Sequence, residues 1–121
     1  MTIIPILYLK STLIASIQTE LTDEEVLLFQ SNLLKKNHKL NTKGVIIDVS
    51  TLDVIDSYMA KVLKDLTSMV KLQGSVFLLS GVKPAVSSTL VDMGMMLNNV
   101  ETFLSLDQAF DYLSTKVQAK K

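Results

Sequence analysis

The chain has 121 residues, twelve basic and twelve acidic side chains, one histidine and no cysteine. This length predicts a single domain that can bury a core of its own. Zero net charge gives no bulk attraction to nucleic acid. The missing cysteine excludes disulfides and thiol chemistry, and one histidine excludes a multi-histidine metal site.

The amino terminus is apolar only from Ile3 to Leu9, and Pro5 interrupts that stretch. No basic leader precedes it and no small-residue cleavage site follows it, which argues against a signal peptide. No apolar run approaches the ~20 residues that a membrane-spanning helix needs. We therefore expect a cytoplasmic protein with no membrane partner.

The first forty residues predict a hairpin followed by a helix. Residues 3–9 and 12–18 read as strands, and Pro5 favours an edge position for the first. Thr22 and Glu25 form a capping box that starts a helix running to about Asn37. Apolar residues cover more of this helix than one core stripe needs, which fits either a well-buried helix or a second face that meets another subunit. They are Val26, Leu27, Leu28, Phe29, Leu33 and Leu34.

Strands and helices alternate in the remainder of the chain. The expected strands are residues 44–49, 75–79 and 100–103, and the expected helices are residues 57–73, 84–93 and 106–117. Such alternation predicts parallel strands joined by right-handed crossovers. The fold class is therefore α/β: a mixed, mostly parallel sheet with an amino-terminal hairpin and about four helices. We expect the domain to occupy residues 1–117 and residues 118–121 to form a frayed tail.

A short acidic stretch, Asp53-Val54-Ile55-Asp56-Ser57, lies where a strand gives way to a helix. Loops at the carboxyl ends of parallel strands are the usual functional edge of such sheets. Ser57 has two interpretations. It can cap the helix, at about 1 kcal/mol over alanine. Alternatively it is a phosphorylation site, where a phosphate of charge roughly −1.5 to −2 would disturb a docked partner more than the fold.

The acids at positions 48, 53 and 56 allow a third hypothesis. Together with Lys83 they could form a catalytic or Mg²⁺ site like that of a response-regulator receiver domain. That pattern also requires acids and a helix directly after the first strand, where this chain has Lys10, Ser11 and a hairpin. General acid–base catalysis by these carboxylates has no visible partner group.

Other side chains that could form a site have simpler roles. Tyr58, expected to be exposed, is a candidate for an interface, because large aromatic residues contribute strongly to binding energy. His38 is expected at the surface near a helix end. The methionines at 93, 95 and 96 fit core packing better than a partner-binding patch.

Two stretches resemble the STAS domain family, the fold of anti-sigma-factor antagonists: GVIIDVSTLDVIDS with its following helix, and FLSLDQAFDYL. Within the family, four further stretches resemble the short RsbS-type domains of the bacterial stressosome. They are IPIL, ASIQTEL, DVIDSYMAKVLKDL and GVKPAVSSTLVDMG. General antagonists usually have Ser or Thr and then Gly-Leu after the Asp-Ser pair, whereas this chain continues with Tyr58-Met59-Ala60-Lys61.

The resemblance implies a non-enzymatic scaffold, without cofactors or metal, in a stress-signalling cascade. Such proteins hold an RsbT-like serine kinase until the residue matching Ser57 is phosphorylated, and a serine phosphatase later resets it. They assemble with RsbR-like STAS paralogues into a large complex. We expect Asp53, Asp56, Tyr58 and Lys61 to contact the kinase. The alternative is a general anti-sigma-factor antagonist that binds an anti-sigma kinase directly. Both a monomer and a homodimer remain open for the isolated chain.

Overall fold

A computed structural model describes residues 4–18, 21–95 and 101–119 of the chain. Its strands and helices follow in the order β1 (Ile6–Leu9), β2 (Thr12–Ser16), α1 (Asp23–Leu40), β3 (Gly44–Asp48), α2 (Ser57–Leu72), β4 (Val76–Ser80), α3 (Pro84–Asp92), β5 (Glu101–Phe103) and α4 (Leu106–Ala119). The five strands form one sheet in sequence order. β1 pairs antiparallel with β2, and every other pairing is parallel. The predicted α/β class, with its hairpin and four helices, is confirmed for this part of the chain.

The hairpin turn has a left-handed backbone conformation that is unusual for its two residues, Lys10 and Ser11. Lys10 and Ser11 both have positive φ angles, 50° and 61°, and Leu9 pairs with Thr12 across the turn. Two successive left-handed residues are what a tight type I′ hairpin requires, and Asn-Gly is the usual choice. β1 begins after Pro5, later than expected, and Ile3 lies outside the described residues. β2 ends at Ser16, two residues earlier than expected.

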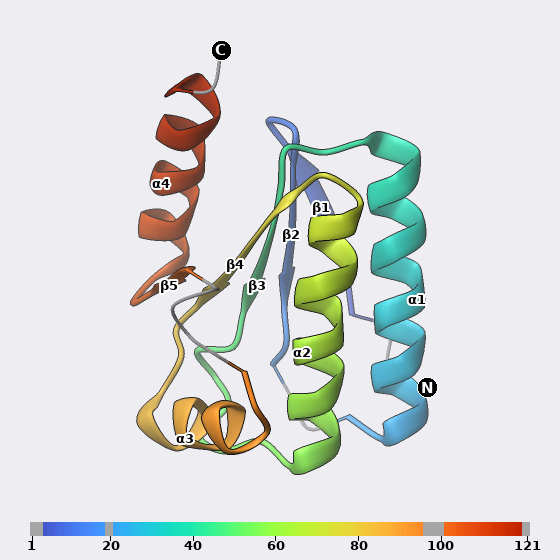
Figure 1. Ribbon diagram of the computed structural model, residues 1–121, viewed down its shortest axis with the longest axis vertical. Helices are drawn as coiled ribbons and strands as arrows, with labels where there is room; N and C mark the ends of the chain where they lie inside the picture. The colour runs from blue at the N-terminus through green and yellow to red at the C-terminus, as the bar shows by residue number, and fades with distance from the viewer. Residues whose placement is uncertain (1–3, 19–20, 96–100, 120–121) are drawn as a thin grey trace.

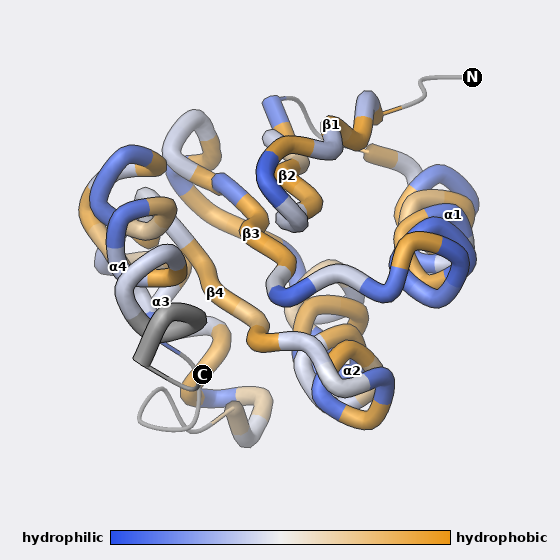
Figure 2. Tube along the Cα trace, turned by 90° about the horizontal axis from the view of Figure 1, so that it is seen from above, coloured by the Kyte–Doolittle hydropathy of each residue, from blue (hydrophilic) through white to orange (hydrophobic). Residues whose placement is uncertain are grey.

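Helices cover both faces of the sheet. α1 and α2 pack side by side on one face, and α4 lies on the other (Figure 1). Seen from above in Figure 2, the two helix layers lie on opposite sides of β3 and β4. The central strands are therefore apolar on both sides. Val45 and Ile47 of β3 join the cluster under α1 and α2, whereas Ile46 contributes to the cluster under α4.

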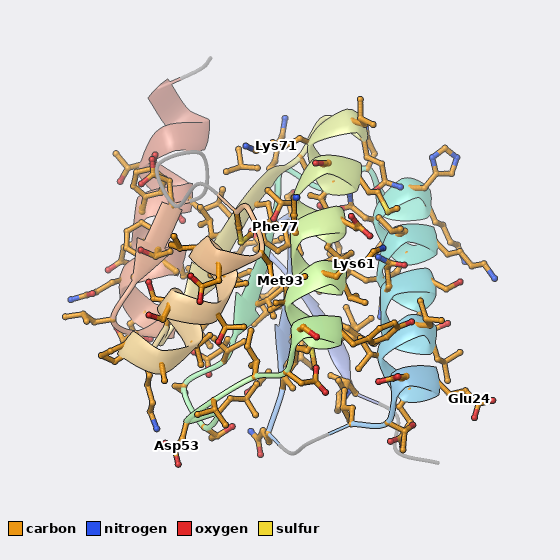
Figure 3. The ribbon with its side chains drawn as sticks, turned by 60° about the horizontal axis from the view of Figure 1, so that its bottom comes forward. Glu24, Asp53, Lys61, Lys71, Phe77 and Met93 are labelled. Atoms are coloured by element: carbon orange, nitrogen blue, oxygen red, sulfur yellow. The ribbon has the colours of Figure 1, made fainter. Side chains whose placement is uncertain are left out.

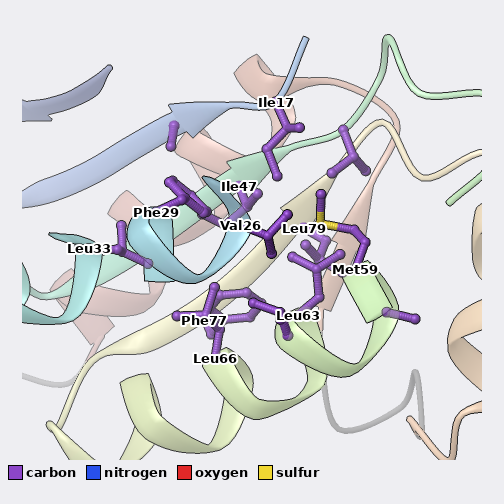
Figure 4. Packing of buried hydrophobic residues seen from close by; sticks show 14 of the residues in the cluster. Ile17, Val26, Phe29, Leu33, Ile47, Met59, Leu63, Leu66, Phe77 and Leu79 are labelled. Carbon is purple, nitrogen blue, oxygen red and sulfur yellow. The ribbon is translucent and has the colours of Figure 1, made fainter. Parts of the chain in front are cut away.

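The larger core is packed from α1, α2 and the sheet, as Figure 4 shows. Phe29 and Leu33 of α1 and Leu63 and Leu66 of α2 belong to this cluster, and all four side chains are buried. Met59 brings the first turn of α2 into the same cluster. This anchors the start of α2 firmly against the sheet.

The capping box of α1 is present as predicted. The Glu25 amide donates to Thr22 Oγ1 at 3.1 Å, and the Thr22 amide donates to Glu25 Oε1 at 2.9 Å. α1 continues to Leu40, three residues beyond the predicted end. The wide apolar surface of α1 is only partly core: Leu27 is 48% exposed and Leu34 packs against the cluster. A second subunit on that face stays a prediction.

Asn37 is a buried residue within α1, not the end of the helix. Its amide nitrogen donates to Gln73 Oε1 at 2.8 Å and to Ser75 Oγ at 3.0 Å, and its carbonyl oxygen accepts from the Thr42 hydroxyl. Gln73 in turn donates to the Leu34 carbonyl at 3.0 Å. This buried network joins the carboxyl ends of α1 and α2. It also supplies the hydrogen bonds that the polar side chain of Asn37 needs in order to be buried.

α3 and α4 agree closely with expectation. Pro84 is the first residue of α3. Met95 is buried in the core and Met93 packs against it, while Met96 lies outside the described residues. Ser105 Oγ accepts from the Gln108 amide at 3.3 Å at the start of α4. α4 runs to Ala119, past the predicted boundary at residue 117, and residues 120–121 are not described. No helix in the described ranges is long and apolar enough to cross a membrane.

Candidate functional site

The carboxyl ends of the parallel strands converge at one edge of the sheet (Figure 1, bottom). We call this edge the rim. It consists of the loop from residue 49 to 56, the first turn of α2, and the loop from residue 81 to 83. The acidic stretch and Ser57 lie on it, as the sequence predicts for an α/β sheet.

Asp56, not Ser57, caps α2. Asp56 has extended backbone angles, and its Oδ1 accepts from the Met59 amide at 2.7 Å. Ser57 is the first helical residue and is exposed, and its hydroxyl has no hydrogen-bond partner among the described residues. The interpretation of Ser57 as the cap is therefore wrong. Both residue types suit the position, but a carboxylate also gains from the partial positive charge of the helix start.

Asp53 connects the two rim loops. Its Oδ1 lies 2.7 Å from Lys83 Nζ, across thirty residues of sequence. The Asp53 side chain is 85% exposed (Figure 3), so the pair is open to water. The Lys83 ammonium hydrogen-bonds the Asp53 carboxylate and holds its pKa below the ordinary value.

Asp48 lies below the rim and is buried. It accepts from Ser80 Oγ at 2.6 Å and from Ser50 Oγ at 2.7 Å, which joins the ends of β3 and β4. Asp48, Asp53 and Asp56 thus share no hydrogen-bond partner: Asp48 accepts from two serines, Asp53 from Lys83 and Asp56 from the Met59 amide. The described ranges contain no group of three or more acidic, histidine or cysteine side chains that could hold a metal ion. Within the described residues, the three carboxylates do not form the shared site that the receiver hypothesis requires.

The two rim loops approach each other closely. A Cβ added at Gly81 would come within 2.4 Å of Ser50 Cβ, and Gly81 has φ +71°. Its amide donates to the Phe103 carbonyl at 2.7 Å. Only glycine fits both the close approach and the left-handed backbone. The rim is therefore held by backbone contacts as well as by the ion pair.

Three further side chains complete the surface beside Ser57. Tyr58 is only half-buried, because it packs against the core next to Met59, and it is less exposed than expected. Lys61 is exposed, and its Nζ lies 3.1 Å from Asp65 Oδ2. Val54 is 61% exposed, and no role was predicted for it from the sequence. The sequence does contain a sign of this exposure: Val54 is an apolar residue in a polar loop, and it fits neither a helical nor a strand periodicity.

Residues 6–109 match the STAS domain family, so the chain belongs to that family. Within it, the chain is similar over nearly its whole length to RsbS. A serine-to-glutamate variant of Moorella thermoacetica RsbS shares 34% identity at a TM-score of 0.89, covering 95% of this chain and 97% of that one. A chain from a structure of the stressosome, described as a signal integration and transduction hub, shares 35% identity at a TM-score of 0.85. That match covers 93% of this chain and 98% of the other.

Two curated relatives from Bacillus subtilis are longer than this chain. The RsbT co-antagonist protein RsbRB is 28% identical over 103 residues, which are 85% of this chain and 37% of the relative. The related RsbRA matches over 26% of its length. The chain therefore spans between a quarter and two fifths of the length of these two relatives.

Proposed function

We propose that this protein is a non-enzymatic phospho-switch scaffold. Its rim holds a serine kinase of the RsbT type until that kinase phosphorylates Ser57. One observation carries the proposal: an exposed serine hydroxyl, without a hydrogen-bond partner in the described part of the chain, sits at the first position of a helix that its neighbour Asp56 already caps.

Phosphorylation at this position leaves the fold intact, because Ser57 makes no hydrogen bond that the modification would break. The Asp56 cap and the burial of Met59 hold the first turn independently of Ser57. A solved RsbS relative retains this fold with one serine replaced by glutamate, so an added acidic side chain is compatible with the architecture.

The same phosphate changes the charge of the rim strongly. It adds roughly −1.5 to −2 charges beside Asp56 and near the loop that carries Asp53. Repulsion between charges at ~7 Å is only ~0.6 kcal/mol in water, but it rises when a partner excludes water. Val54 and Tyr58 offer apolar contact at the same place, so a docked partner would remove water from the rim.

The partners follow from the similarity to stressosome proteins. We propose that the chain assembles with RsbR-like STAS paralogues into a large complex, and that a serine phosphatase resets Ser57. The similarity to RsbS over nearly the full chain, and to part of RsbRB, supports this part of the proposal.

Binding of a purified RsbT-like kinase tests the proposal. We expect Ser57→Asp to weaken the affinity about tenfold or more, which corresponds to about 1.4 kcal/mol. Ser57→Ala should bind as wild type. Ser68→Asp is the matched control, because it adds the same charge at an exposed serine elsewhere on α2. Calorimetry measures all four proteins.

Unchanged affinity of Ser57→Asp, or an equal loss in Ser68→Asp, would contradict a switch at the rim. Sizing of the assembly separates the two kinds of partner. A megadalton complex with the long paralogue supports the stressosome, whereas a small heterodimer with a kinase alone favours the general anti-sigma-factor antagonist.

A further inference from the structure

Lys61 lies midway between Ser57 and Asp65 on one face of α2. Each neighbour is four residues away, so both are within reach of a lysine side chain on a helix surface. The Lys61 side chain is 64% exposed and its Nζ lies 3.1 Å from Asp65 Oδ2, while Asp65 is 38% exposed. Figure 3 shows Lys61 partway along α2, above the rim that carries Asp53.

The Lys61–Asp65 ion pair is easy to break. Exposed pairs contribute little to stability, because water and salt screen them. The orientation is also the less favourable one for a helix, since the lysine precedes the acid by four residues. Lys61 is therefore paired weakly in the unmodified protein.

We propose that phosphorylation of Ser57 transfers Lys61 from Asp65 to the phosphate, so that the modification is transmitted along α2. This inference rests on the proposed function, because Ser57 must be the modified residue. The phosphate carries roughly twice the charge of a carboxylate and three acceptor oxygens. It also precedes Lys61 by four residues, which is the favoured orientation.

Neighbouring lysines are less well placed to replace Lys61. Lys64 follows Ser57 by seven residues, about 10 Å along the helix axis, and its Nζ donates to the Met93 carbonyl at 3.2 Å. Lys83 is held by Asp53. Lys61 is thus the lysine of α2 at one-turn spacing from Ser57.

The transfer changes the surface at two places. Lys61 pairs with the phosphate and is no longer available to a docked partner. Asp65 becomes a carboxylate without a paired lysine. Asp65 is eight residues from Ser57, about 12 Å along α2. A partner that contacts α2 beyond the rim therefore encounters a new negative charge without being near the phosphate.

The second pKa of the phosphate reports this contact. Phosphoserine is placed at position 57 by genetic encoding, without any kinase, and the full chain is titrated by phosphorus-31 NMR. A nearby cation favours the dianion and lowers this pKa. We expect Lys61→Gln to raise it by about 0.3, the size of a helix-surface pair. Asp65→Asn should lower it, because the competing carboxylate is gone.

Lys64→Gln is the matched control, since it removes the same charge from the same helix at longer range. It should change the phosphate pKa by less than half as much as Lys61→Gln. Equal effects of the two lysine variants, or no effect of Asp65→Asn, would overturn the transfer. Because the phosphate is installed without a kinase, the titration is independent of the kinase-binding test above. If Lys61 does not move to the phosphate, Ser57 can still control kinase binding. If Ser57 does not control kinase binding, the phosphate pKa can still be measured.

Discussion

At the scale of single residues, neighbouring polar side chains of the rim have different roles. Asp53 fixes the loops through Lys83, Asp56 holds the helix start, and Ser57 remains accessible. Adjacent polar residues of similar type therefore have different roles, and composition alone did not separate them. Both aspartate and serine are good helix caps, and only the backbone geometry at residue 56 decides between them.

The pH response of Asp53 tests its contact with Lys83. Its folded-state pKa is depressed, so the stabilisation by this pair is present above the unfolded-state pKa and is lost as the pH falls through the folded-state value. Carboxyl NMR titration should show Lys83→Gln raising the Asp53 pKa toward its ordinary value. Lys61→Gln should leave the Asp53 pKa unchanged, because Lys61 pairs with Asp65 and does not contribute to the Asp53 shift. An Asp53 pKa that does not respond to Lys83→Gln would show that the pair does not persist in solution.

At the scale of elements, most helices and strands could be predicted because their signals are local. The Thr22 capping box, the 3.6-residue period of α2 and Pro84 at the start of α3 all act within a few residues. What was missed depends on distant contacts. Asn37, expected at the end of α1, is instead buried within the helix against Gln73 and Ser75, whose proximity only the tertiary fold creates.

The cap of α2 gives an element-scale prediction. Asp56→Ala should lower the free energy of unfolding by about 1 kcal/mol, because the Met59 amide loses its acceptor. Ser57→Ala should stay within about 0.5 kcal/mol of wild type, since it breaks no described hydrogen bond. Urea denaturation of the two variants measures both. A loss from Ser57→Ala as large as that from Asp56→Ala would mean that Ser57 also supports the helix start.

At the scale of the whole molecule, the parallel sheet gathers loops from distant parts of the chain at one rim. Alternation of strands and helices predicted that edge and placed Ser57 on it. It could not predict that Gly81 would lie against Ser50, that Asp48 would bond Ser80, or that Tyr58 would turn toward the core. The location of the site therefore follows from the sequence pattern, whereas its detailed geometry depends on packing between loops.

The most direct test of the account is the position and number of phosphates that a partner RsbT-like kinase adds. Mass spectrometry of the wild-type protein after incubation with kinase and ATP should find one phosphate, on Ser57. The Ser57→Ala variant, which keeps its fold because Asp56 still caps α2, should take up none. Full phosphorylation of Ser57→Ala at another residue would contradict the central claim.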